Sequence, residues 1–76
     1  MKELLTYLAQ NLVDNPDAVS VNQFERDGET VLELHVAQED MGKVIGRQGR
    51  IAKEIRTLIR SVAQRSGTRV FVEIVD

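Results

Sequence analysis

The sequence predicts an α+β domain in which a three-stranded mixed sheet carries three helices on one face. Two segments repeat apolar residues at helical spacing, and three others alternate them at strand spacing. A pair of glycines separates the last two predicted helices. The resulting order is helix, strand, strand, short helix, long helix, strand. With 76 residues the chain has the length of one small domain, so we expect residues 1–76 to fold as a single unit.

The first predicted element is a helix over residues 2–13. Its apolar residues recur at helical spacing and are expected to lie in the core: Leu4, Leu5, Leu8, Leu12 and Val13. Asn15-Pro16 ends the pattern, because proline cannot continue a helix and restricts the residue before it. The single tyrosine, Tyr7, is expected to be a partly buried surface residue.

A β-hairpin is predicted next. Val19, Val21 and Phe24 indicate a first strand, in which the break in strict alternation is typical of a bulge. Asp27-Gly28 is a tight-turn dipeptide between two strand-like segments. The second strand alternates more strictly, with apolar side chains on one face and polar ones on the other: Leu32, Leu34 and Val36 against Glu33 and His35.

Two helices follow the hairpin. Asp40 is expected to cap a very short helix over residues 41–45, which Gly46 and Gly49 interrupt. From Arg50 the helical period returns, and one apolar stripe follows it: Ile51, Ile55, Leu58, Ile59 and Val62. Gly67 suits a left-handed residue at the end of this helix.

The last predicted strand covers residues 70–75 and is apolar on much of both faces. Because two helices connect it to the hairpin, it is expected to run parallel to one of the first two strands. Phe71 and Val75 then lie on the sheet face that no helix covers. We expect this apolar surplus, or part of the long helix, to support self-association.

The composition excludes several classes of protein. Apolar residues make up 42% of the chain, which is enough for a packed fold. There is no cysteine for a disulfide or thiolate metal site, and His35 is the only histidine. No serine or threonine has a recognisable general base beside it, so we expect neither catalysis nor a cofactor. Without an apolar segment of about 20 residues or a signal peptide, the expected location is the cytoplasm.

Charge is distributed unevenly along the chain. Residues 1–40 hold two basic and nine acidic residues, a net charge of −7. Residues 41–76 hold eight basic and three acidic residues, a net charge of +5. A molecule polarised in this way can attract a polyanion although its total charge is −2. A solvated helix face explains the asymmetry equally well, so the charge alone decides nothing.

The segment around Gly46-Arg47-Gln48-Gly49 is the candidate binding site. Glycines without Cβ atoms allow another backbone to approach closely, and the start of the following helix presents unpaired N–H groups that suit phosphate. The expected contact residues are the loop itself, two apolar residues before it that offer a floor for a base, and the flanking cations: Lys43, Val44, Ile45, Gly46, Arg47, Gln48, Gly49, Arg50 and Lys53.

Two other glycine-rich motifs do not fit. A Walker A loop needs Gly-Lys-Ser/Thr, whereas Gly42-Lys43 is followed by Val44. A dinucleotide fingerprint needs a glycine at the position of Val44. A bare pair of glycines three residues apart is more often a tight turn between helices, so the pattern acquires meaning only with its neighbours.

The longer pattern Val-Ile-Gly-x-x-Gly-x-Ile, ending at Ile51, resembles the signature of KH domains. The predicted order of elements is similar to the bacterial type II KH arrangement over the whole chain, and the closest resemblance is to the KhpA family of small stand-alone KH proteins. Many KH loops carry lysine where this one has Arg47. The resemblance implies a cytoplasmic RNA chaperone or regulator that binds single-stranded RNA through its GxxG loop. It also implies a homodimer, or a heterodimer with a second KH protein of the Jag/KhpB/EloR type.

Two alternatives stay open at this point. The domain is either an RNA-binding protein in its own right or a dimerisation scaffold whose partner supplies most of the RNA affinity. The intact glycines and the basic second half favour direct binding. Binding of single-stranded DNA is a third possibility, because the sequence does not distinguish this ligand from RNA.

Overall fold

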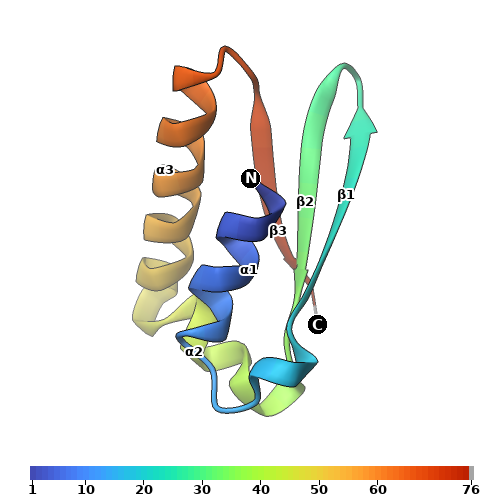
Figure 1. Ribbon diagram of the computed structural model, residues 1–76. Coiled ribbons are helices and arrows are strands. Elements are labelled where there is room, and N and C mark those ends of the chain that lie inside the picture. Colours follow the sequence, from blue (N-terminus) through green and yellow to red (C-terminus); the bar gives the residue numbers. More distant parts are fainter. Residues whose placement is uncertain (76) are drawn as a thin grey trace.

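The computed structural model describes residues 1–75 and confirms the predicted order of elements (Figure 1). The helices are α1 (Lys2–Gln10), α2 (Met41–Ile45) and α3 (Arg50–Arg65), and the strands are β1 (Ser20–Arg26), β2 (Glu29–His35) and β3 (Val70–Val75). Short 3-10 helices link them: η1 (Pro16–Ala18), η2 (Gln38–Asp40) and η3 (Arg47–Gly49). The helices lie on one side of the sheet. Within the described residues, no helix is both long enough and apolar enough to cross a membrane.

The sheet has the order β1-β2-β3, antiparallel between β1 and β2 and parallel between β2 and β3. The predicted hairpin is confirmed: Arg26 pairs with Glu29, and Asp27 and Gly28 between them both have positive φ, as a type I′ turn requires. The expected bulge is wrong, because all seven residues of β1 pair in unbroken register. Phe24 breaks the apolar alternation simply because it faces the open side of the sheet.

The core lies between the sheet and the helices. Its largest fully buried apolar side chains come from four of the elements: Leu5, Leu32, Leu34, Val44 and Ile59. Burying side chains of this size contributes about 1.5–3 kcal/mol each. One residue from each of the two predicted apolar stripes lies outside the core, since Leu12 is 37% and Leu58 is 44% exposed. Leu12 follows the end of α1 at Gln10, and Leu58 lies on the side of α3 turned away from the sheet.

A row of apolar side chains crosses the open face of the sheet. Phe24 pairs with Val31, and Val31 pairs with Phe71 on the other side. Val31 is buried between these neighbours, whereas the two phenylalanines are among the most exposed large apolar residues. This confirms that Phe71 adds apolar surface to the uncovered face.

Asp40 stands directly before α2, as expected, but its side chain makes no capping bond there. Its carboxylate is fully buried and instead accepts the backbone N–H of Asn15 at 3.0 Å. The other carboxylate oxygen lies 3.6 Å from Nζ of Lys43. Asp40 therefore ties the connection after α1 to the start of α2, a long-range role that its sequence position did not reveal.

The junction of α2 and α3 depends on Gly46. Its backbone has φ 77° and ψ 174°, a region open essentially to glycine alone. A Cβ atom there would lie 2.6 Å from Cγ1 and 2.9 Å from the backbone nitrogen of Ile51. The two helices therefore meet at a distance that excludes any side chain. Gly49 also has positive φ, but the space around its missing Cβ is open.

Alanine substitutions at Gly46, Gly49 and Gly42 should change stability by different amounts, and this order tests the contact between Gly46 and Ile51. We expect Gly46→Ala to lower the free energy of unfolding by at least about 2 kcal/mol, since it adds a clash to an unfavourable dihedral. Gly49→Ala should cost about 1 kcal/mol through its dihedral alone. Gly42→Ala, inside α2 with open space, should be neutral or stabilising. Urea unfolding of the three variants checks this order, and equal effects at Gly46 and Gly42 would contradict it.

Candidate nucleic-acid interface

The Gly46–Gly49 loop exposes two polar side chains between its glycines. It folds as η3, and Arg47 and Gln48 are both exposed at its tip. Gln48 has φ 58°, in the left-handed region that few non-glycine residues occupy. The hydrogen bond from the Gly49 N–H to the Gly46 carbonyl, at 3.2 Å, closes the loop around them. The backbone thus presents both side chains to solvent.

The loop leads directly into the positive end of a long helix. α3 begins at Arg50 after Gly49, and no side chain caps its first turn. N–H groups that a capping side chain does not satisfy, together with the helix dipole, suit an anion such as phosphate. The short α2 ends on the other side of the loop, where the Gly46 N–H donates to the Gly42 carbonyl at 2.9 Å. Both helix ends therefore meet at the glycine pair.

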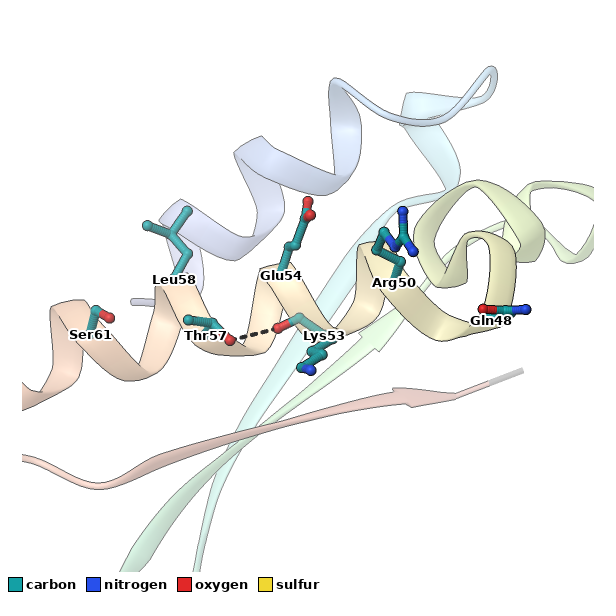
Figure 2. Close-up of a pocket in the computed structure, with 7 residues that line it drawn as sticks. All are labelled: Gln48, Arg50, Lys53, Glu54, Thr57, Leu58 and Ser61. Carbon is teal, nitrogen blue, oxygen red and sulfur yellow. Dashed lines mark hydrogen bonds between the residues drawn. The ribbon is translucent and has the colours of Figure 1, made fainter.

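Three cations extend the positive charge from the loop, because Arg47, Arg50 and Lys53 are all exposed. Figure 2 shows Lys53 leaving α3 on one side and Arg50 on another. Gln48, Arg50 and Lys53 line a shallow hollow of about 670 Å³ that continues along α3 with four further residues: Glu54, Thr57, Leu58 and Ser61. The sequence motif did not indicate this continuation along the helix.

Lys43 is less available than the sequence indicated. Its Nζ lies 3.0 Å from the carboxylate of Asp14 and 3.6 Å from that of Asp40. Asp14, through a hydrogen bond and its charge, raises the pKa of Lys43 above its usual range, so the side chain is a cation at neutral pH. A phosphate would have to compete with Asp14 for it. The partner lies in the segment after α1, where local patterns gave no sign of it.

The two apolar residues before the loop lie in different environments. Val44 is fully buried and belongs to the core, whereas Ile45 is 36% exposed. Only Ile45 therefore offers a side chain to a ligand, and Val44 is removed from the surface of the site. In a helix as short as α2, packing against the common core decides which residue turns inward.

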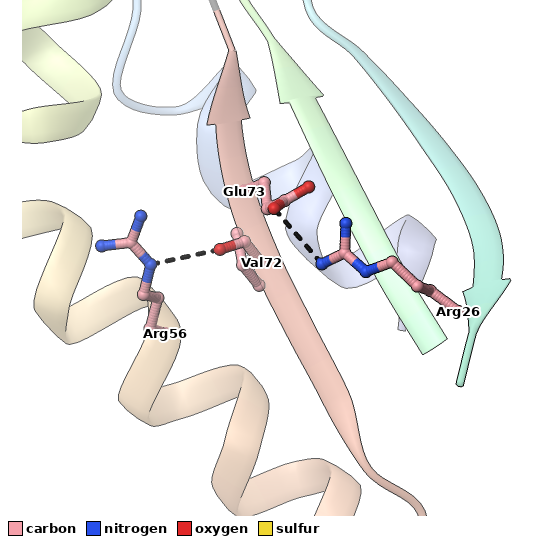
Figure 3. A network of polar contacts seen from close by, with 4 residues as sticks. All are labelled: Arg26, Arg56, Val72 and Glu73. Carbon is pink, nitrogen blue, oxygen red and sulfur yellow. Dashed lines mark hydrogen bonds and ion pairs between the residues drawn. The ribbon is translucent and has the colours of Figure 1, made fainter. Parts of the chain in front are cut away.

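Arg56 is a further candidate that the motif did not include. Its Nε donates to the Val72 carbonyl at 3.2 Å, so the side chain spans from α3 to the outer edge of β3 (Figure 3). A guanidinium carries five N–H donors, and one bond leaves others for a ligand. Across the strand, Arg26 pairs with Glu73 at 3.4 Å. In the sequence, only its spacing of three residues from Lys53 indicated that Arg56 could belong to the binding site.

Comparison with known proteins places this geometry in a family. Residues 2–74 match the family model described as KhpA/KhpB, KH domain. A protein of Caldanaerobacter subterraneus subsp. tengcongensis, named RNA-binding protein KhpA, is 55% identical over 75 residues, covering 99% of this chain and 100% of that protein. The protein of the same name from Clostridium acetobutylicum has the same identity and coverage. That from Chlamydia pneumoniae is 46% identical over 76 residues, covering 100% of this chain and 97% of that protein.

A solved structure has the same fold within a larger protein. Aquifex aeolicus Era, in a crystal structure with GDP and aluminium fluoride, superposes with a TM-score of 0.66 and 24% identity. The match covers 96% of this chain and 28% of the Era chain, and at this identity it shows the fold alone. The family model and the full-length relatives go further than fold. The chain belongs to the KhpA/KhpB family of KH domains.

Proposed function

We propose that this chain is an RNA chaperone or post-transcriptional regulator that binds single-stranded RNA through the Gly46-Arg47-Gln48-Gly49 loop. The relatives that match over nearly the whole chain are named RNA-binding proteins, which supports the ligand. The observation that carries the proposed site is the loop itself: two exposed polar side chains between glycines, at the start of a helix that no side chain caps.

In the proposed mechanism the loop holds the phosphate backbone. Arg47 and Gln48 donate to phosphate oxygens, with the forked guanidinium of Arg47 able to make two bonds at once. The Arg50 N–H donates to the Arg47 carbonyl, so the N–H groups that follow it in the first turn of α3 bind a neighbouring phosphate, and Lys53 adds charge beyond them. Bases lie past Ile45 towards the gap between α3 and β3. No aromatic residue lies in the loop or its flanks, so we expect modest affinity and loose sequence preference.

We further propose that two KH chains work together, as a homodimer or with a Jag/KhpB/EloR-type protein. A groove of about 280 Å³ between α1 and α3 supports this, because Leu12 and Leu58 are exposed in it above Ile51 and Ile55. Two weak RNA sites joined in this way gain effective concentration. The same groove supports the alternative of a scaffold whose partner supplies most of the RNA affinity.

The charge of the loop tip is the first test. Arg47→Asp combined with Gln48→Asp keeps both glycines but turns negative charge towards phosphate, so RNA binding should be lost while the fold remains. Lys2→Asp with Gln10→Asp makes the same charge change on α1 and should keep binding. Fluorescence anisotropy measures affinity, and circular dichroism checks the fold. RNA binding by the loop variant equal to that of the wild type would refute the proposed site.

Salt dependence tests the number of phosphates held. About three contacts to a single strand predict a slope near −2 for log affinity against log salt concentration. A slope indistinguishable from zero would exclude the backbone mechanism.

Breaking the Asp14–Lys43 ion pair should raise RNA affinity, whereas the loop variant should lower it. Asp14→Asn should free Lys43 and raise RNA affinity about two- to fivefold, with one added contact steepening the salt slope by about 0.7. Stability should change little, because surface ion pairs contribute about 0–1 kcal/mol. Asp17→Asn, an equal charge change on η1, is the control. If both variants raise affinity equally, only net charge matters and Asp14 does not restrain Lys43.

Self-association is tested at the groove between α1 and α3. We expect light scattering at tens of micromolar to give a dimer mass for the wild type when no partner is present. Leu58→Asp places a charge in the groove and should give a monomer. Phe24→Asp, on the open sheet face, should remain a dimer. A dimer that survives in Leu58→Asp and is lost in Phe24→Asp would move the interface to the sheet.

A further inference from the structure

A second hollow lies at the end of α3 farthest from the glycine loop. It has a volume of about 500 Å³ and follows the outer edge of β3, from the last turns of α3 to the open face of the sheet on which Phe71 lies. Its polar and aromatic lining comes from three segments of the chain: Glu29, Arg60, Gln64, Thr68, Arg69 and Phe71. None of these residues belongs to the KH motif, and the mechanism proposed above does not use them.

The lining has the chemistry that a nucleotide requires. Phe71 is 44% exposed and is an aromatic side chain on which a base can stack. Gln64 carries amide donors and an acceptor for the edge of a base, and Thr68 donates its hydroxyl to the Ala63 carbonyl, which leaves its lone pairs as acceptors. Arg60 is exposed on the helix and suits a phosphate.

A line of cations connects this hollow to the glycine loop. Lys53, Arg56 and Arg60 follow one another at spacings of three and four residues and so share one face of α3. Arg56 shows which way that face is turned, because it reaches Val72 on β3 (Figure 3). The helix rises about 15 Å from Arg50 to Arg60. KH loops engage about four nucleotides, so a longer strand would extend into the hollow.

Two acidic residues near this path are ion-paired, and a third, Glu54, leaves α3 on the side opposite Lys53 (Figure 2). Glu73 is paired with Arg26 at 3.4 Å across the open face of the sheet. Glu29 is paired with Arg69 at 3.4 Å, and Arg69 is still 82% exposed. Within residues 1–75, no carboxylate lies within ion-pairing distance of Arg60. The charge along α3 is therefore available to a polyanion.

We infer that the hollow at Phe71 is a second nucleotide site, which binds a base and phosphate of the same RNA strand that the Gly46–Gly49 loop holds. The inference rests on the proposed RNA-binding function. It explains how a domain without an aromatic residue at its loop gains stacking energy from an RNA longer than about four nucleotides. The affinity for short RNA depends on the loop alone.

The test compares RNAs of about four and about ten nucleotides, because only the longer one can reach both sites. Phe71→Ala and Arg60→Gln should each weaken binding of the longer RNA about tenfold and leave the shorter one unchanged. The matched controls are Phe24→Ala, the other exposed phenylalanine of the same cross-strand row, and Arg65→Gln at the end of α3. Both controls should bind the two RNAs like the wild type. Because a longer RNA also offers more binding registers, the comparison between variants is decisive.

A measurement on the unaltered protein guards against misfolded variants. Backbone amide signals of residues 64–71 should shift in NMR spectra with the longer RNA and stay in place with the shorter one. Unchanged signals with the longer RNA, or full affinity in Phe71→Ala, would overturn the inference. A Phe71→Ala variant that changes the mass in light scattering but not RNA affinity would show a protein contact instead, which also overturns it. If the wild type binds neither RNA, the proposed function fails, and the inference with it.

Discussion

The contact between Gly46 and Ile51 is the constraint on which the rest of this molecule depends. A missing Cβ lets the end of α2 touch the first turn of α3, and the Gly46 backbone serves both sides: its N–H closes α2, and its carbonyl accepts the bond that closes the loop. The start of α3 is thereby fixed beside an exposed tip. A wider separation would still allow three helices and a sheet, but the uncapped start of α3 would no longer lie beside Arg47 and Gln48.

The basic residues form two groups: some are held in ion pairs with acidic residues, and others are exposed and free to bind an anion. The acidic first half of the sequence supplies partners for basic residues outside α3 or at its margin: Asp14 for Lys43, and Glu29 for Arg69. Arg26, one of the two basic residues of the first half, is in turn paired with Glu73 of β3. The exposed cations from Arg47 to Arg60 lie along the loop and α3. A net charge of −2 is compatible with this basic surface because the acidic and basic residues are concentrated in different halves of the sequence.

Local patterns predicted the elements well and their partners poorly. The hairpin turn at Asp27-Gly28, the long helix from Arg50 and its left-handed end at Gly67 all follow from interactions within a few residues, and all are confirmed. The fate of Val44 and Ile45 was not predictable, since neighbouring residues on a five-residue helix diverge by about 100° and only packing against the common core selects one of them. The predicted capping role of Asp40 was wrong because the hydrogen-bond partner of its side chain, the Asn15 N–H, is distant in sequence.

The proposed dimer groove and the proposed second nucleotide site lie on different sides of α3, although Leu58 also lines the hollow that continues from the glycine loop. Leu58 lines the groove between α1 and α3, whereas Arg60 lines the hollow beside β3. Residues two positions apart on a helix are separated by about 200°, so the side chains of Leu58 and Arg60 point in nearly opposite directions. A chain docked at Leu58 would leave the hollow at Arg60 and Phe71 open, but it would meet the hollow that Lys53 and Leu58 line together. Under the two proposals, dimerisation would change affinity through protein concentration, whereas the gain from a longer RNA would depend on the aromatic ring of Phe71.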